Sequence, residues 1–145
     1  MMLVSLMIAA AISAAQPAPG DLGAVQSPSD FHDACMGVVE FSQEAAKIDP
    51  KKLEKELAKN GGRDGAMIQM VGEFCTGMIQ TAVTVVREAD EYKISGQKVC
   101  VDPALTGKQV LDELGNLVRE DIPELRSAAT PHMLVAALLR LSSCN

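Results

Sequence analysis

Cysteine and histidine are the residue types in this chain that could carry chemistry. His32 lies three residues before Cys35, so in a helix the two side chains would be neighbours and could form a nucleophile and its base. The other cysteines are Cys75, Cys100 and Cys144, and none of the four has the close C-x-x-C spacing of zinc sites. An even number of cysteines in a small exported chain usually forms disulfides. We therefore predict two disulfide bonds and no catalytic cysteine.

The N-terminus has the outline of a secretory signal peptide. Residues 1–15 carry no charged side chain, residues 3–12 are almost wholly apolar, and Ser13 and Ala15 are small residues placed for cleavage before Gln16. The basic residue that usually opens a signal peptide is missing. The alternative is a buried helix of a cytosolic protein, but such a helix should present a polar face. We therefore expect residues 1–15 to be removed and the protein to be periplasmic.

Composition and charge limit the class of the mature chain. Residues 16–27 are rich in Pro, Gly and Ala and are expected to be a flexible lead-in, and residues 28–145 have the length of one domain. The net charge of −6 and the 3% aromatic content argue against a nucleic-acid partner, because phosphate contacts need Lys and Arg. No apolar run reaches the roughly 20 residues of a membrane span. No membrane partner is therefore expected after signal cleavage.

Apolar residues recur at helical spacing, which predicts an all-α fold of about four to five helices. Ser27 followed by Pro28 is a strong helix start, and Thr106 with Gln109 predicts a capping box. Residues 92–101 are less regular and could be extended. The expected helices cover residues 28–47, 51–60, 64–88 and 106–122, and a last helix that starts between 127 and 131 and ends near 141.

Four cysteines allow three pairings, and helix geometry favours one of them. If the first and central helices are antiparallel neighbours, Cys35 and Cys75 both lie roughly 17 Å from the connecting end, because a helix rises about 1.5 Å per residue. Cys100 stands just before one helix and Cys144 just after the next, so these ends would meet in an antiparallel pair. The predicted disulfides are therefore Cys35–Cys75 and Cys100–Cys144.

The methionines raise the alternative of a copper site, since thioethers suit Cu(I). They lie on or beside the predicted apolar stripes, where methionine fills gaps in a core. We therefore predict no metal and no cofactor, and we do not expect an enzyme. The methionines in question are Met36, Met67, Met70, Met78 and Met133.

Seven ordered segments from Phe74 onward, followed by Cys144, carry a family resemblance. They are Phe74-Cys75-Thr76-Gly77-Met78-Ile79, Val99-Cys100-Val101-Asp102-Pro103, Leu105-Thr106-Gly107-Lys108-Gln109-Val110, Leu117-Val118, Pro123-Glu124-Leu125-Arg126, Ala128-Ala129 and Leu134-Val135-Ala136-Ala137-Leu138. In this order and spacing, the second half of the chain resembles the Rap/Tai family of type VI secretion amidase immunity proteins. The chain departs from the family pattern at Met78, where tyrosine is frequent, and at Ser143, where proline is frequent.

The resemblance implies a non-enzymatic immunity protein that binds and blocks a cognate peptidoglycan amidase effector, and it leaves room for a homodimer. Because the helix stripes are needed for the core, we expect the partner to be bound by loops. Tyr92 is of a type enriched in binding hot spots, and Glu120, Asp121 and Glu124 could meet a basic cleft rim. The alternatives are a periplasmic structural or stress-response protein without a toxin partner, and a small-molecule carrier.

Overall fold

All regular structure in the described part of the chain is helical, as predicted. The computed structural model describes residues 27–91, 99–142 and 144. No helix among these residues combines the length and the apolar character needed to cross a membrane. In chain order the elements are α2 (Pro28–Ala45), α3 (Pro50–Leu57), the 3-10 turn η2 (Lys59–Gly62), α4 (Arg63–Glu91), α5 (Gly107–Glu120), the 3-10 turn η3 (Pro123–Leu125) and α6 (Thr130–Leu141).

The helix starts follow the chemistry predicted from the sequence. Ser27 caps α2, because its side-chain oxygen accepts a hydrogen bond from the backbone N–H of Asp30 at 3.0 Å, and Pro28 follows at the first helical position. Thr106 and Gln109 form the predicted capping box at the start of α5. Local side-chain chemistry therefore fixes where these two helices begin.

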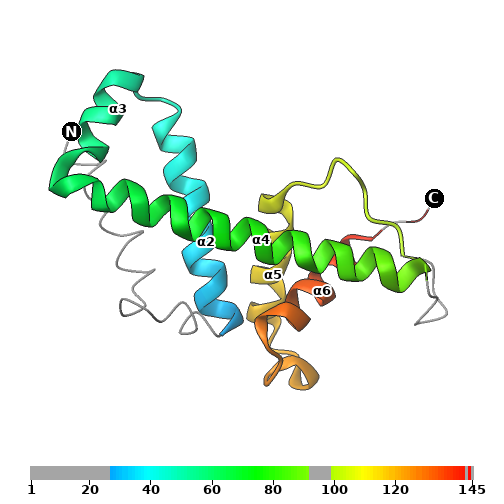
Figure 1. The fold of residues 1–145 in the computed structure, drawn as a ribbon. Coiled ribbons are helices and arrows are strands. Elements are labelled where there is room, and N and C mark those ends of the chain that lie inside the picture. The colour runs from blue at the N-terminus through cyan, green and yellow to red at the C-terminus, as the bar shows by residue number, and fades with distance from the viewer. Residues whose placement is uncertain (1–26, 92–98, 143, 145) are drawn as a thin grey trace.

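The predicted antiparallel arrangement of the first and central helices is wrong. Figure 1 shows α2 running across the long helix α4, and α3 with η2 spans the distance between the end of α2 and the start of α4. Helix α5 packs against α2, and α6 packs against both α4 and α5. The antiparallel arrangement had been assumed in order to compare the positions of Cys35 and Cys75, whereas α3 and η2 hold the end of α2 apart from the start of α4.

The core lies where α2, α4, α5 and α6 meet. Phe31 of α2 is fully buried there, and its ring meets Phe74 of α4 edge to face at 5.9 Å between centroids. The predicted apolar stripes of α5 and α6 are buried in the same cluster. The largest fully buried side chains are Phe31, Leu114, Leu134, Leu138, Val86, Val110 and Cys35.

Helices α2 and α5 approach closely at Gly115. A Cβ atom added at Gly115 would lie 2.6 Å from the Nε2 atom of His32, which is closer than real atoms pack. The side chain of His32 therefore takes the place that any larger residue at 115 would need. Gly115 is itself buried, so the absence of a side chain there is what leaves room for the His32 ring between the two helices.

Both predicted disulfides are present. Cys35 is joined to Cys75, with 5.8 Å between their Cα atoms, and Cys100 is joined to Cys144, with 5.1 Å between theirs. Near the second bridge, the backbone N–H of Cys100 donates to the Ser142 hydroxyl at 2.8 Å. Most of the stretch that could have been extended, residues 92–98, lies outside the described residues, and residues 99–101 form no strand.

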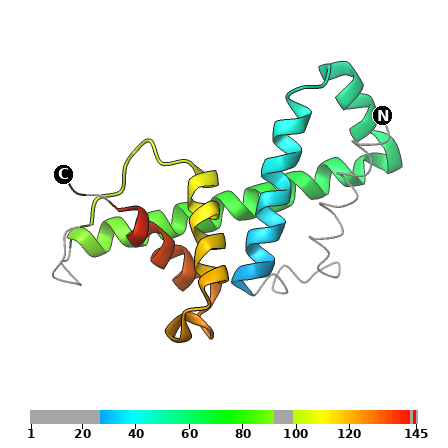
Figure 2. The same ribbon diagram turned by 180° about the vertical axis from the view of Figure 1, so that it is seen from behind.

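The Cys35–Cys75 bridge closes a segment that we call the arm, residues 36–74. The arm contains the end of α2, α3, η2 and the start of α4, and it projects from the rest of the described fold (Figures 1 and 2). Val71 is the one arm residue that is buried. The disulfide therefore joins two helices at the base of a segment that contributes little to the core.

Candidate functional site

The loop between α5 and α6 contains three of the four predicted partner-binding residues. Glu120 ends α5, Asp121 follows it, and Glu124 lies in η3, and all three are exposed. We call residues 120–126 the acidic turn. The fourth predicted residue, Tyr92, lies outside the described residues. The structure thus brings Glu120, Asp121 and Glu124 to one surface, while their role in binding stays a prediction.

Glu120 is held by an arginine from the last helix. The guanidinium of Arg140 donates to both carboxylate oxygens of Glu120 at 2.7 Å, and it reaches Oε1 of Glu113 at 3.4 Å. These hydrogen bonds hold the pKa of the Glu120 carboxyl below its ordinary value and raise the pKa of the Arg140 guanidinium. The three side chains tie the end of α5 to α6.

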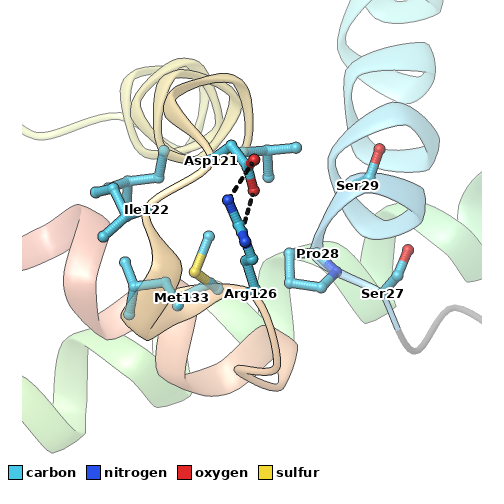
Figure 3. Close-up of a pocket in the computed structure, with 10 residues that line it drawn as sticks. Ser27, Pro28, Ser29, Asp121, Ile122, Arg126 and Met133 are labelled. Atoms are coloured by element: carbon cyan, nitrogen blue, oxygen red, sulfur yellow. Dashed lines mark hydrogen bonds and ion pairs between the residues drawn. The ribbon is translucent and has the colours of Figure 1, made fainter.

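Asp121 is also paired within the turn. Its backbone is left-handed, with a φ of 50°, which Asp tolerates better than most residues. Arg126 donates to its two carboxylate oxygens at 2.9 and 3.0 Å (Figure 3). Glu124 has no hydrogen bond or ion pair to another described side chain. Glu124 is therefore the carboxylate of the acidic turn that a partner could reach without displacing an arginine of the chain itself.

A cavity of about 230 Å³ lies beside the acidic turn. Pro28 borders it on one side, and Asp121 and Arg126 lie on the other (Figure 3). Its remaining wall is mainly apolar and comes from Leu117, Val118, Ile122, Leu125 and Met133. The cavity is smaller than the roughly 300 to 1,000 Å³ of typical ligand pockets.

A larger groove of about 590 Å³ runs between α2, α4 and the start of α5. The Cys35–Cys75 bridge contributes to its lining, and Gln69, Glu73 and Lys108 add polar groups. The apolar part is aliphatic and consists of Val38, Val39, Ile68, Ile79 and Leu111. Its volume falls within the range of small-molecule sites.

The structure does not support the nucleophile and base considered for Cys35 and His32. The sulfur of Cys35 is bonded to Cys75, and the His32 ring packs over Gly115 with its Nδ1 atom 3.0 Å from Asp33 Oδ1. Among the described residues, no group of three His, Cys, Asp or Glu side chains is placed to hold a metal ion. Of the methionines considered for copper, Met133 is buried and Met70 is exposed.

Sequence reasoning missed the arginines that engage the acidic turn. Arg140 pairs with a residue 20 positions earlier, and Arg126 pairs with a residue five positions earlier, across η3. Neither separation has the i,i+3 or i,i+4 spacing that predicts side-chain pairs on one helix. The sequence therefore contained the acidic residues of this surface but no signal for their counter-ions.

No protein-family model, no curated protein and no solved structure matches this chain.

Proposed function

We propose that the chain is an exported immunity protein that binds a type VI secretion peptidoglycan amidase in the periplasm and blocks its cleft. The observation that carries this proposal is the helical frame closed by two disulfides, Cys35–Cys75 and Cys100–Cys144. Three of these four cysteines belong to the segments that resemble the Rap/Tai immunity family. A frame cross-linked in this way suits a stoichiometric inhibitor, because a rigid surface loses little conformational freedom on binding.

The acidic turn suits the contact that such an inhibitor needs. Glu120 and Asp121 are fixed in place by Arg140 and Arg126, and this leaves Glu124 exposed on an ordered loop. A basic rim around an amidase cleft would be attracted to this turn. Tyr92 is proposed as a second contact on the basis of its residue type alone.

Co-expression tests the proposed function in cells. The amidase is first identified by a periplasmic pull-down with the protein. It is then expressed with a signal peptide, so that it enters the periplasm and its activity should lyse the cells. Expression of the full chain should prevent lysis, whereas a chain without residues 1–15 should not, because it would not be exported. Lysis that continues despite export of the chain would contradict the proposal.

Charge reversal at Glu124 tests the surface within the same assay. Glu124→Lys should weaken protection, and Tyr92→Ala should weaken it separately, while the helical circular dichroism spectrum stays unchanged. Glu40→Lys is a matched control, because it reverses one exposed charge on α2, outside both the acidic turn and the tip of the segment that contains α3. Full protection by both test variants would move the binding surface elsewhere.

The groove between α2, α4 and α5 favours a second candidate, a carrier of small apolar molecules. Five aliphatic side chains line it, and its volume of about 590 Å³ would hold such a ligand. Native mass spectrometry of protein purified from the periplasm distinguishes the candidates. A bound lipid that is lost on Val38→Gln substitution would favour the carrier, and a mass equal to that of the bare mature chain would count against it.

A further inference from the structure

The tip of the arm concentrates positive charge on a chain that is otherwise acidic. We define the arm tip as residues 50–63, that is α3, η2 and the first residue of α4. Lys51, Lys52 and Lys55 of α3 and Arg63 are all exposed. Residues 47–64 hold six basic and four acidic residues, a net charge of +2, whereas the rest of the chain holds seven basic and fifteen acidic residues, a net charge of −8.

These four cations are not neutralised by carboxylates of the described fold. The ion pairs of this region use other lysines: Lys47 contacts Glu44 and Lys59 contacts Glu56, each at 2.6 Å. Among the described residues, no ion pair involves Lys51, Lys52, Lys55 or Arg63.

Two of the acidic groups in this region are already engaged. The Asp49 carboxylate caps α3 by accepting hydrogen bonds from the backbone N–H groups of Lys51 and Lys52, and that of Glu56 accepts one from Lys59. Glu54 of α3 and Asp64 of α4 are the two carboxylates of this region that have neither a cation nor a backbone group as a partner within the described residues, against four such cations. The arm tip therefore presents an excess of unpaired positive charge.

The lysines of α3 belong to a helix that contributes little to the core. Helix α3 has no buried residue, and its apolar side chains Leu53 and Leu57 are only partly covered. Lys51 and Lys55 are one helical turn apart, and like charges at this spacing cost about 0.2 to 0.5 kcal/mol. A short helix with no fully buried residue and with a repulsive lysine pair is nevertheless held on an arm whose base is cross-linked by Cys35–Cys75.

We infer that the arm tip is a docking surface for an acidic polypeptide segment of a partner protein. Charge complementarity identifies the partner: four unpaired cations on a projecting element attract a run of Asp and Glu side chains. An anionic membrane fits less well, because α3 has no large exposed apolar side chain to insert into the lipid: Leu53 and Leu57 are both partly covered. Leu57, for example, packs against the first turn of α4 at Gly65. The inference does not depend on whether the partner is an amidase.

Poly-L-glutamate is the probe that tests this surface. The mature chain should bind fluorescein-labelled poly-L-glutamate at an ionic strength of about 10 mM, where the Debye length is about 30 Å, and should lose most of this binding at about 150 mM. The triple variant Lys51→Gln/Lys52→Gln/Lys55→Gln should bind about tenfold more weakly, since each exposed ion pair contributes up to about 1 kcal/mol. Circular dichroism checks that the variant keeps its helices.

A second triple variant serves as the matched control. Arg87→Gln/Lys108→Gln/Arg119→Gln removes the same amount of charge from exposed residues outside the arm tip, and its affinity should stay within about twofold of the parent. Equal losses in the two variants, or no binding by the parent chain, would overturn the inference. Stronger lysine-dependent binding to phosphatidylglycerol vesicles than to poly-L-glutamate would also overturn it, in favour of a membrane.

Discussion

At the scale of single residues, the acidic turn owes its shape to charge pairs within the chain. Arg140 binds Glu120 with two hydrogen bonds, and Arg126 does the same with Asp121. Surface pairs of this kind add little to stability, but bidentate geometry fixes the position of both partners. Their effect is to order the loop that displays Glu124.

The pairing of Glu120 with Arg140 predicts a measurable titration shift. The pKa of the Glu120 carboxyl should lie below its ordinary value of 4.5, because the hydrogen bonds from Arg140 favour the charged form. The contribution of this pair to stability is then present above the unfolded-state pKa and is lost as the pH falls through the lower, folded-state pKa. Carboxyl-detected NMR titration checks the shift. Arg140→Gln should return the pKa to its ordinary value, and an unshifted pKa in the parent chain would contradict the pairing.

Gly115 offers a second test at the same scale. Gly115→Ala should lower the free energy of unfolding by up to about 2 kcal/mol, because the overlap of the new methyl group with the His32 ring outweighs the gain of about 1 kcal/mol in helix propensity. In urea denaturation, His32→Ala combined with Gly115→Ala should recover part of the loss, since the ring that clashes is then absent. Equal losses in the single Gly115→Ala and the double variant would show that the clash is not with His32.

Residue-level features were predictable where they depend on local chemistry. The capping box of Thr106 and Gln109 and the cap at Ser27 follow from residue types at fixed offsets, so the sequence predicted them correctly. The counter-ions Arg126 and Arg140 depend on how distant segments fold together, and a single sequence has no pattern for that.

At the scale of elements, the arm is a projecting segment whose two helices are joined at its base by one disulfide. The predicted pairing of Cys35 with Cys75 is confirmed, although the antiparallel packing assumed for it is not. The pairing requires only that α2 and α4 pass close to each other at the two cysteines, whose Cα atoms are 5.8 Å apart. Helical periodicity fixed the lengths of α2 and α4, but the angle between them depends on how their side chains pack, which periodicity does not specify.

Removing the first bridge should loosen the arm more than the core. Cys35→Ser/Cys75→Ser should lower the free energy of unfolding by roughly 4 kcal/mol in the chain-entropy model. Hydrogen exchange should rise through residues 36–74, because Val71 is the one residue there that is buried. Cys100→Ser/Cys144→Ser, which opens a loop of similar length, is the matched control and should leave exchange in the arm unchanged. Equal hydrogen exchange in the arm for both variants would contradict the claim that the Cys35–Cys75 bridge holds the arm in place.

At the scale of the whole molecule, the two charged surfaces belong to different parts of the fold. The acidic turn joins α5 to α6, whereas the basic arm tip lies on the other side of α4 from that turn in Figure 1. The all-α class was predictable from helical periodicity, since the four packed helices each bury one stripe. The projection of the arm was not, because it depends on α3 standing apart from the core.

Export is a whole-chain prediction that rests on residues 1–15. Cell fractionation followed by N-terminal sequencing should find the protein in the periplasm, beginning at or near Gln16. Ala15→Arg should slow cleavage, because signal processing needs a small residue at that position. Uncleaved protein in the cytosol would contradict the prediction.

Titration of a purified amidase with the purified mature chain tests the central proposal most directly. The amidase is the one recovered from the periplasmic pull-down, and its activity is followed as release of cleaved peptidoglycan stem peptides. Amidase activity should fall linearly with added protein and end near equimolar amounts, because a stoichiometric inhibitor occupies each cleft once. Amidase activity that is unchanged by a large excess of the mature, disulfide-bonded chain would contradict the proposal.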